Sequence, residues 1–183
     1  MLEHAGSAEH AEHYDPEANK IGMWLFLTTE ILLFGVLFIA YAVYYSEHRR
    51  DFKAGSAELD LLLGAVNTAV LLTSSLPMAL AIHALRRGRK AACLALLGAT
   101  IGCALLFLVL KSSEWSAKFG HDLYPGAPGM VDRTPGFNQF IGLYYLSTGL
   151  HALHVIAGAF LLLLVLLSVR SGATHAGRPS LIE

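Results

Sequence analysis

Long apolar stretches alternate with short polar ones along the 183-residue chain, and this pattern predicts its fold. Four of the apolar stretches can cross a bilayer, since a membrane-spanning helix needs about twenty residues. Only helices and closed barrels satisfy every backbone polar group inside a membrane. We therefore expect an all-α, polytopic membrane bundle with helices over about residues 21–45, 61–85, 91–110 and 137–169.

These stretches divide the chain into two predicted regions. Residues 1–20 form an acidic, histidine-containing tail without a basic start or a cleavage site, so we expect no signal peptide, and the first span itself directs insertion. Residues 21–183 form the transmembrane domain. The last apolar stretch exceeds one hydrocarbon thickness, and its polar start, FNQF, is expected to project beyond the membrane.

The charges between the spans predict the orientation. The turn at residues 86–90 holds four cations and no acid, and cytoplasmic loops are enriched in Lys and Arg. The turn is therefore predicted to be cytoplasmic, which places both termini in the cytoplasm and residues 46–60 and 111–136 outside. The second of these outer connections is rich in Pro and Gly and is expected to form a cap.

Composition excludes some classes of function. The chain is 55% hydrophobic with a formal net charge of −1, and it lacks the basic patch that nucleic-acid binding requires. Cys93 and Cys103 both fall in the third span without a C-x-x-C pattern, so we expect small buried residues and neither a disulfide nor a metal site. Gly98 and Gly102 either permit close helix approach or reflect the usual glycine content of membrane helices.

A glutamate, Glu30, lies well inside the first predicted span and far from any other charge in sequence. A carboxylate at that depth costs about 2.5–3.5 kcal/mol on insertion scales. It must therefore be protonated, paired, or turned toward protein, lipid headgroups or water. Glu30 is the first candidate for a functional residue.

Two histidines in the fourth span, His151 and His154, share neighbouring parts of one helix face. A bis-histidine haem would need a partner at similar depth on another helix, but His83 lies at the cytoplasmic end of its span. A non-haem metal would need more ligands than Glu30. Because Glu30 and His154 both lie near mid-span, we predict that they approach within reach of a hydrogen bond or a single water and share a proton.

Polar residues in the second and third spans are further candidates. Asn67 and Thr68 are expected to bridge helices through hydrogen bonds. Glu114 and Trp115 are expected just beyond the end of the third helix, at the membrane interface. There Glu114 could cap the helix, pair with Lys111, contact a partner protein, or remain a solvated acid.

The sequence resembles subunit III of the haem-copper cytochrome oxidases through motifs in the family's order. WLFLTTEILLF matches the segment whose intramembrane glutamate falls on Glu30, and AVNTAVLLTSS with HALRRGRK matches the next helix and its basic turn. KSSEW matches a glutamate and an aromatic residue that fall on Glu114 and Trp115. STGLHALHVIAG matches the paired-histidine signature, which falls on His151 and His154.

This resemblance implies an accessory subunit that binds no redox cofactor itself. It would pack in a bacterial inner membrane against subunit I, which holds haem and copper, in a complex that includes subunit II. The resemblance also implies bound phospholipid and support for proton uptake into subunit I, roles that fall on Glu30, His151 and His154. The electron donor could be cytochrome c or quinol, and a related branch accompanies nitric oxide reductases.

The acidic tail allows two interpretations. Its histidines have Ala, Ser and Glu as neighbours and no closing ligand pattern, so we expect a solvated, poorly ordered tail and no metal site. Under the resemblance they could form a proton-collecting cytoplasmic surface, because imidazoles titrate near neutral pH. These histidines are His4, His10 and His13.

The chain departs from the family pattern at both ends. It starts where the third helix of seven-helix members would be, which is typical of the short bacterial type. That type has five helices, but this sequence stops at PSLIE, so we expect the final helix to be absent, supplied by another polypeptide, or missing from this sequence.

Two other classes of protein remain as alternatives. One is a small membrane cytochrome that uses the histidines as haem ligands. The other is a transporter subunit with Glu30 as a proton-coupled site, which the lack of an internal repeat and of a broken-helix pair disfavours.

Overall fold

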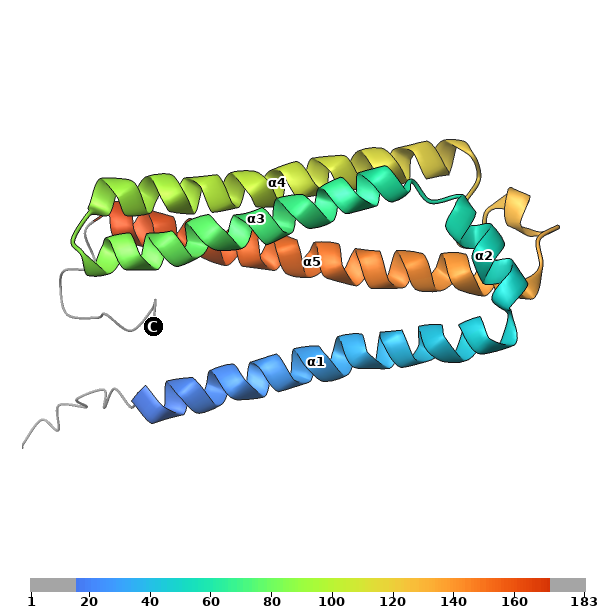
Figure 1. Cartoon of the computed structure of the whole chain (residues 1–183), viewed down its shortest axis with the longest axis horizontal. Helices are drawn as coiled ribbons and strands as arrows, with labels where there is room; N and C mark the ends of the chain where they lie inside the picture. Colours follow the sequence, from blue (N-terminus) through green and yellow to red (C-terminus); the bar gives the residue numbers. More distant parts are fainter. Residues whose placement is uncertain (1–15, 172–183) are drawn as a thin grey trace, which may run out of the picture. The chain divides into compact units, whose positions relative to one another are not determined.

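The structure, a computed structural model, describes residues 16–171 (Figure 1). Within that range the chain is helical apart from its turns and connections, and it contains no strand. The all-α fold class is therefore confirmed. In chain order the elements are α1 (Pro16–Glu47), α2 (Arg49–Ala57), α3 (Leu61–Arg86), α4 (Lys90–Gly120), the short 3-10 helix η1 (Pro128–Met130) and α5 (Pro135–Ser171).

The four expected membrane spans are present. Lys20–Glu47 of α1 and the whole of α3, α4 and α5 are long and apolar enough to cross a bilayer. At 1.5 Å per residue, the 31 residues of α4 and the 37 of α5 extend over about 46 and 55 Å. The hydrocarbon core of a bilayer is only about 30 Å thick, so both helices continue beyond it.

The end of α4 differs from the prediction. The sequence predicts that this span ends near residue 110, but the helix continues to Gly120. Lys111 ends the apolar stretch without ending the helix, because no Gly or Pro follows before Gly120 and the intervening Lys, Glu and Ala are good helix formers. The prediction that Glu114 and Trp115 lie beyond the helix is therefore wrong, since both are within α4.

The chain divides into two compact units, residues 1–35 and residues 36–183, and each is described by itself. The described part of the first unit is the beginning of α1. The hydroxyl groups of Thr28 and Thr29, next to Glu30, donate hydrogen bonds of 2.8 and 2.7 Å to carbonyl oxygens of the same helix. These hydroxyls are thus satisfied within the helix, which suits apolar surroundings.

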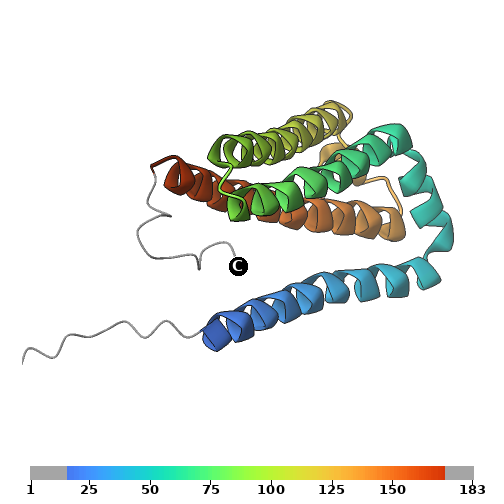
Figure 2. The same ribbon diagram turned by 60° about the vertical axis from the view of Figure 1, so that its left-hand side comes forward.

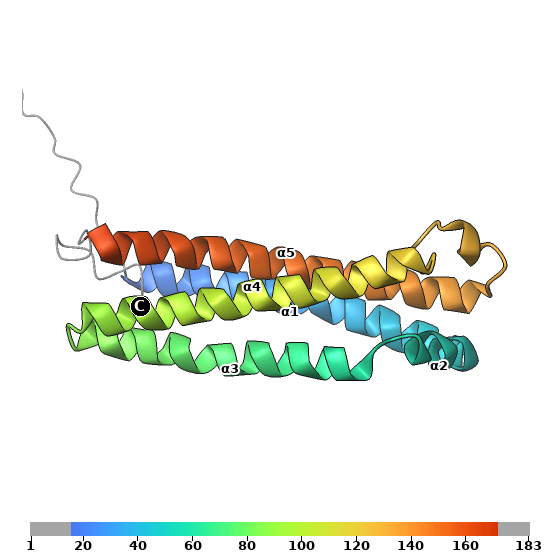
Figure 3. The ribbon, with the colours of Figure 1, turned by 90° about the horizontal axis from the view of Figure 1, so that it is seen from above.

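In the second unit a tight basic turn reverses the chain between α3 and α4. Gly88 has a φ of 69°, in the left-handed region. Its N–H donates to the carbonyl of Leu85, and the N–H of Arg89 donates to that of Ala84, both at 2.9 Å. This pattern is a Schellman motif, in which glycine ends a helix without strain. Figure 3 shows α3 and α4 side by side as a result, and the two helices pack together.

The helix α4 also packs against α5, so α3, α4 and α5 form one bundle (Figures 1 and 2). The buried residues of α4 recur at steps of three, four or seven, which keeps them on one helix face. This buried stripe is apolar toward the basic turn and charged at its other end. It consists of Cys93, Leu97, Thr100, Phe107, Glu114 and Lys118.

At the basic turn the three helices meet in a cluster of small and aliphatic side chains, which we call the turn cluster. Small residues let membrane helices approach closely. Cys93 is buried there as expected, whereas Cys103 is only part-buried. The buried members of the turn cluster are Ala81, Ala84, Cys93, Leu97 and Val169.

The G-x-x-x-G pair of α4 is not a site of close helix approach within the described bundle. Nothing in the structure lies within 4 Å of the position that a Cβ would take at Gly98 or Gly102. Within the second unit, Gly98 and Gly102 therefore reflect the usual glycine content of membrane helices and do not mark a close helix contact.

At the opposite end of the bundle, α2 packs against α5. Phe52 of α2 is 1% exposed, and its ring lies edge-on to Phe140 of α5 with the centroids 5.3 Å apart. Phe52 is also edge-on to Tyr41 and Tyr45 in the last turns of α1. A Cβ at Gly55 would overlap the Phe140 ring. This aromatic packing fixes the position of the link that leads from α2 into α3.

Candidate functional site

Three charged side chains of α4 lie in the interior of the bundle. Glu114 and Lys118 are 8% and 7% exposed. The ammonium of Lys111 is 2.9 Å from Oε2 of Glu114, and that of Lys118 is 3.6 Å from Oε1. One buried carboxylate therefore pairs with two ammonium groups.

Tyr144 of α5 completes this group. Its hydroxyl donates a hydrogen bond to Oε1 of Glu114 and accepts one of 3.0 Å from Lys111. The Lys111 and Lys118 ammonium groups also lie 4.9 and 4.7 Å from the centroid of the Tyr144 ring, within range of cation–π attraction. We call Lys111, Glu114, Lys118 and Tyr144 the charge cluster. It links α4 to α5 and offsets the desolvation of its buried charges.

The periodicity of α4 places these residues together. Glu114 and Lys118 belong to the buried stripe, and Lys111 lies one turn after Phe107. All three therefore face α5, where they contact Tyr144, as Phe107 faces α5 through His151. The spacing of these charged residues on one helix face can be recognised in the sequence. A hydropathy profile does not show that they are buried, because a charged residue ends an apolar stretch whether or not it is buried.

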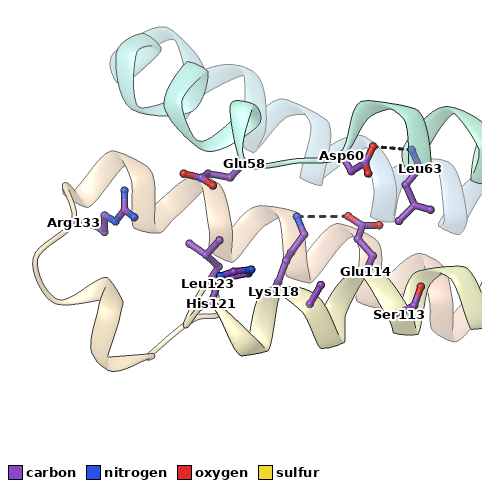
Figure 4. Close-up of a pocket in the computed structure, with 10 residues that line it drawn as sticks. Glu58, Asp60, Leu63, Ser113, Glu114, Lys118, His121, Leu123 and Arg133 are labelled. Atoms are coloured by element: carbon purple, nitrogen blue, oxygen red, sulfur yellow. Dashed lines mark hydrogen bonds and ion pairs between the residues drawn. The ribbon is translucent and has the colours of Figure 1, made fainter.

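A pocket of about 540 Å³ opens beside the charge cluster (Figure 4). Its walls come from the end of α4, the link between α2 and α3, and the connection that follows α4. Asp60 begins α3 as its N-cap and accepts a 3.0 Å hydrogen bond from the backbone N–H of Leu63. The charged and titratable residues of the lining are Glu58, Asp60, Glu114, Lys118, His121 and Arg133.

The environment of Glu114 decides between two of the alternatives stated above. Glu114 is buried and pairs with Lys111, so the pairing with Lys111 is confirmed and the prediction of a solvated acid is wrong. Its neighbour Trp115 is half-buried, with its ring 5.6 Å from that of Tyr145 on α5. Contact of Glu114 and Trp115 with a partner protein stays a prediction.

Asn67 and Thr68 occupy different environments on α3. Asn67 is 5% exposed, and its Oδ1 has no hydrogen-bond partner among the residues that the structure describes. Thr68 donates a 2.9 Å hydrogen bond to the carbonyl of Gly64, within its own helix. That hydroxyl bond does not bridge helices, and bridging by Asn67 stays a prediction.

The two histidines of α5 have distinct neighbours. The ring of His151 lies edge-on to Phe107 of α4, with the centroids 5.5 Å apart. Nδ1 of His154 is 2.7 Å from the carbonyl oxygen of Leu150, one turn earlier. A carbonyl can only accept, so this contact requires the proton on Nδ1 and leaves Nε2 of the neutral ring as an acceptor. Over residues 16–171 no group of three or more His, Cys, Asp or Glu side chains could hold a metal ion.

The remaining candidates lie outside the second unit. Glu30 belongs to α1 in the first unit, and its approach to His154 would join one unit to the other, so that pairing stays a prediction. The tail histidines lie outside the described residues; they are His4, His10 and His13.

The chain is similar to proteins named as oxidase subunits. It is 32% identical over 157 residues to cytochrome c oxidase subunit 3 of Synechocystis sp., covering 86% of this chain and 62% of that protein. It is 29% identical to cytochrome bo(3) ubiquinol oxidase subunit 3 of Pseudomonas aeruginosa, covering 91% and 75%. It is also 29% identical to heme-copper oxidase subunit I+III of Aeropyrum pernix, covering 95% and 21%. The chain thus spans less than two thirds of the Synechocystis relative.

The family comparison covers more of the chain than any single motif. Residues 4–177 match the family described as cytochrome c oxidase subunit III. This match agrees with a membrane fold of four helices long enough to span a bilayer. The chain therefore belongs to the cytochrome c oxidase subunit III family.

Proposed function

We propose that this chain is the accessory subunit III of a respiratory haem-copper terminal oxidase, which reduces oxygen and pumps protons. In the complex it stabilises subunit I and supports lipid binding and proton uptake. The observation that carries the proposal is the family match over residues 4–177. The names of the relatives, which include both cytochrome c and ubiquinol oxidases, support it and do not favour a small membrane cytochrome.

Subunit I is the proposed direct partner, within a complex that also contains subunit II. The Aeropyrum pernix relative, named subunit I+III, supports this pairing because its name joins the two subunits. Haem and copper belong to the partner subunits in this proposal, and the chain supplies no catalytic residue of its own.

The proposed location is a bacterial inner membrane with both termini in the cytoplasm. Val169, near the end of α5, packs with Ala84 and Cys93 next to the basic turn. This packing supports placing the end of α5 on the same side of the membrane as residues 86–90. The positive-inside rule assigns that side to the cytoplasm. The pocket and α2 then face outward.

The lipid and proton roles are proposed for Glu30, His151 and His154. A carboxyl group and an imidazole can share one proton, which lowers the cost of holding both in an apolar region. Protons would reach this region from the cytoplasmic face, where the proposed collecting residues are His4, His10 and His13.

Copurification tests the assignment to an oxidase. The full-length chain, tagged and extracted from its membrane in mild detergent, should retain a haem- and copper-bearing subunit I. The visible spectrum should then belong to that larger subunit. Recovery of the chain without such a partner, or with a Soret band of its own, would contradict the proposal.

The proton role is tested in the same complex. Glu30→Ala should leave the haem spectra unchanged but slow proton uptake or shorten the catalytic lifetime of the oxidase. Glu30→Gln should have a milder effect, since the amide keeps the shape and part of the hydrogen bonding. Unchanged kinetics of Glu30→Ala over prolonged turnover would remove Glu30 from the proposal.

A further inference from the structure

Asn67 of α3 is a buried polar side chain without a protein partner. It is 5% exposed, and its Oδ1 accepts no hydrogen bond from any residue in the range 16–171. A buried acceptor that stays unpaired loses its hydration and gains nothing in return, so native proteins satisfy nearly all such groups with protein donors or ordered water. The amide of Asn67 therefore points to a hydrogen-bond donor beside it.

The packing of α3 against α4 places Lys111 at the level of Asn67. Ala81 of α3 and Leu97 of α4 are both members of the turn cluster. The two helices run antiparallel from the basic turn (Figure 3). Asn67 lies fourteen residues before Ala81, and Lys111 lies fourteen residues after Leu97. Since both helices rise equally per residue, these equal steps bring Asn67 and Lys111 to the same depth, about 21 Å from the turn cluster.

The pocket next to the charge cluster gives the same register from the other end of the bundle. Its lining brings Leu63 of α3 together with Glu114 of α4 (Figure 4). Asn67 follows Leu63 by four residues, and Lys111 precedes Glu114 by three. Residues three or four apart share a helix face. Asn67 and Lys111 therefore lie one turn inward from the pocket, at facing positions of α3 and α4.

The ammonium of Lys111 has one donor to spare. Of its three N–H groups, one bonds Oε2 of Glu114 and another bonds the hydroxyl of Tyr144. Within the described part of the chain the third has no acceptor. An unpaired acceptor and a spare donor thus occupy the same level of the bundle without a direct hydrogen bond between them. One water can bridge two such groups over about 5 Å.

The surroundings favour water over an ion at this position. A buried water needs polar partners, and the pocket of about 540 Å³ opens one turn away, so water has a short route to the site. The charge cluster has two ammonium groups and one carboxylate, so a small anion is the alternative occupant. An anion such as chloride donates no hydrogen bond, however, and would leave Oδ1 of Asn67 unpaired.

We propose that an ordered water between α3 and α4 accepts a hydrogen bond from the ammonium of Lys111 and donates one to Oδ1 of Asn67. The water extends the charge cluster from α4 and α5 to α3, so that one polar network joins the three helices of the bundle. The helix bridge predicted for Asn67 then runs through this water. The inference concerns the interior of the chain and does not depend on the proposed oxidase function.

Asn67→Leu tests the bridge by the sign of its effect. If a water joins Asn67 to Lys111, the substitution breaks the network and should raise the unfolding equilibrium constant of the full-length chain in mixed detergent micelles about tenfold. If the amide has no partner, leucine removes an unpaired polar group of similar size and should lower that constant. A lowered or unchanged constant would overturn the proposal.

Lys111→Met separates the bridge from ordinary packing, because methionine keeps an aliphatic chain but has no N–H donor. In this background Asn67→Leu should no longer raise the unfolding constant, since the water has lost its donor. Thr68→Val is the matched control. The hydroxyl of Thr68 bonds to Gly64 within α3, so this substitution should have the same effect in both backgrounds. A tenfold effect of Asn67→Leu in both backgrounds would overturn the bridge.

A crystal structure of the unsubstituted full-length chain, at a resolution that shows ordered water, identifies the occupant without requiring a variant to fold. One density peak should lie within about 3.2 Å of both Nζ of Lys111 and Oδ1 of Asn67. Crystals soaked in bromide should give no anomalous signal at that peak. Direct contact between the two side chains, an empty gap, or bromide at the peak would each overturn the proposal.

Discussion

The two ends of the bundle of α3, α4 and α5 are held together by different interactions. At the basic turn, small and aliphatic side chains of the turn cluster pack without a buried charge among them. At the other end, Glu114 pairs with two lysines and accepts a hydrogen bond from Tyr144. The first end is maintained by shape alone, whereas the second depends on each charged partner being present.

This difference matters because membrane helices gain little from apolar burial. Lipid tails are as apolar as leucine, so packing and interhelical hydrogen bonds decide how the helices associate. Packing at the turn cluster tolerates small changes in side-chain size. A buried ionic group does not tolerate loss of its shared carboxylate, since the remaining charges keep their desolvation cost.

The largest expected effect is that of Glu114→Ala. The substitution leaves the buried Lys118 and the part-buried Lys111 without their carboxylate, and we expect a loss of about 3–5 kcal/mol in the free energy of unfolding. Reversible unfolding of the full-length chain in mixed detergent micelles measures it. Glu47→Ala, at an exposed position, is the control. A loss from Glu114→Ala as small as that of the control would mean that the charge cluster does not hold the bundle together.

Tyr144→Phe should have the next largest effect. It keeps the ring for the two ammonium groups but removes the hydroxyl that links Glu114 to Lys111. Loss of a hydrogen bond to a charged group is expected to reduce the free energy of unfolding by about 1.5–3 kcal/mol. The same unfolding assay measures it. If Tyr144→Phe in a Glu114→Ala background costs as much as it does alone, the two residues are not coupled.

The sequence predicts the parts of this fold that depend on local pattern. The four spans and the basic turn follow from hydropathy and charge. Burial does not follow from a place in an apolar stretch, since Cys93 is buried whereas Cys103 of the same stretch is only part-buried. The length of α4 does not follow from hydropathy. Lys111 ends the apolar stretch, but its ammonium is stabilised inside the bundle by Glu114 and Tyr144, so the helix continues. The spacing of Lys111 and Glu114 in the sequence predicts that they can pair. The burial of Glu114 depends on the tertiary contact of α4 with α5 and cannot be predicted from that spacing.

The pocket is harder to predict than the helices. Glu58, Glu114 and Arg133 come from three segments that are distant in sequence, and only the packing of α2 on α5 and of α4 on α3 brings them together. A polar residue in a connection looks the same in sequence whether it lines a pocket or faces solvent.

Gly55→Ala should have an intermediate effect at the α2 end. A Cβ at this position would overlap the ring of Phe140, and overpacking of this kind costs about 1–3 kcal/mol. The free energy of unfolding measures it, with Gly98→Ala as the matched control, because nothing lies within 4 Å of a Cβ there. Equal effects of the two substitutions would show that α2 does not pack on α5 as closely as the structure indicates.

The smallest expected effect is that of Cys93→Ala in the turn cluster. Cys93 is 2% exposed and contributes one polarisable sulfur to a group of aliphatic neighbours. Removing one buried atom of this size loses its dispersion contacts and leaves a small cavity, without leaving a charge or hydrogen bond unpartnered, so it should lower the free energy of unfolding by about 1 kcal/mol. The measurement is the same unfolding curve as for Glu114→Ala. A loss for Cys93→Ala as large as for Glu114→Ala would remove the distinction between an end held by shape and an end held by charge.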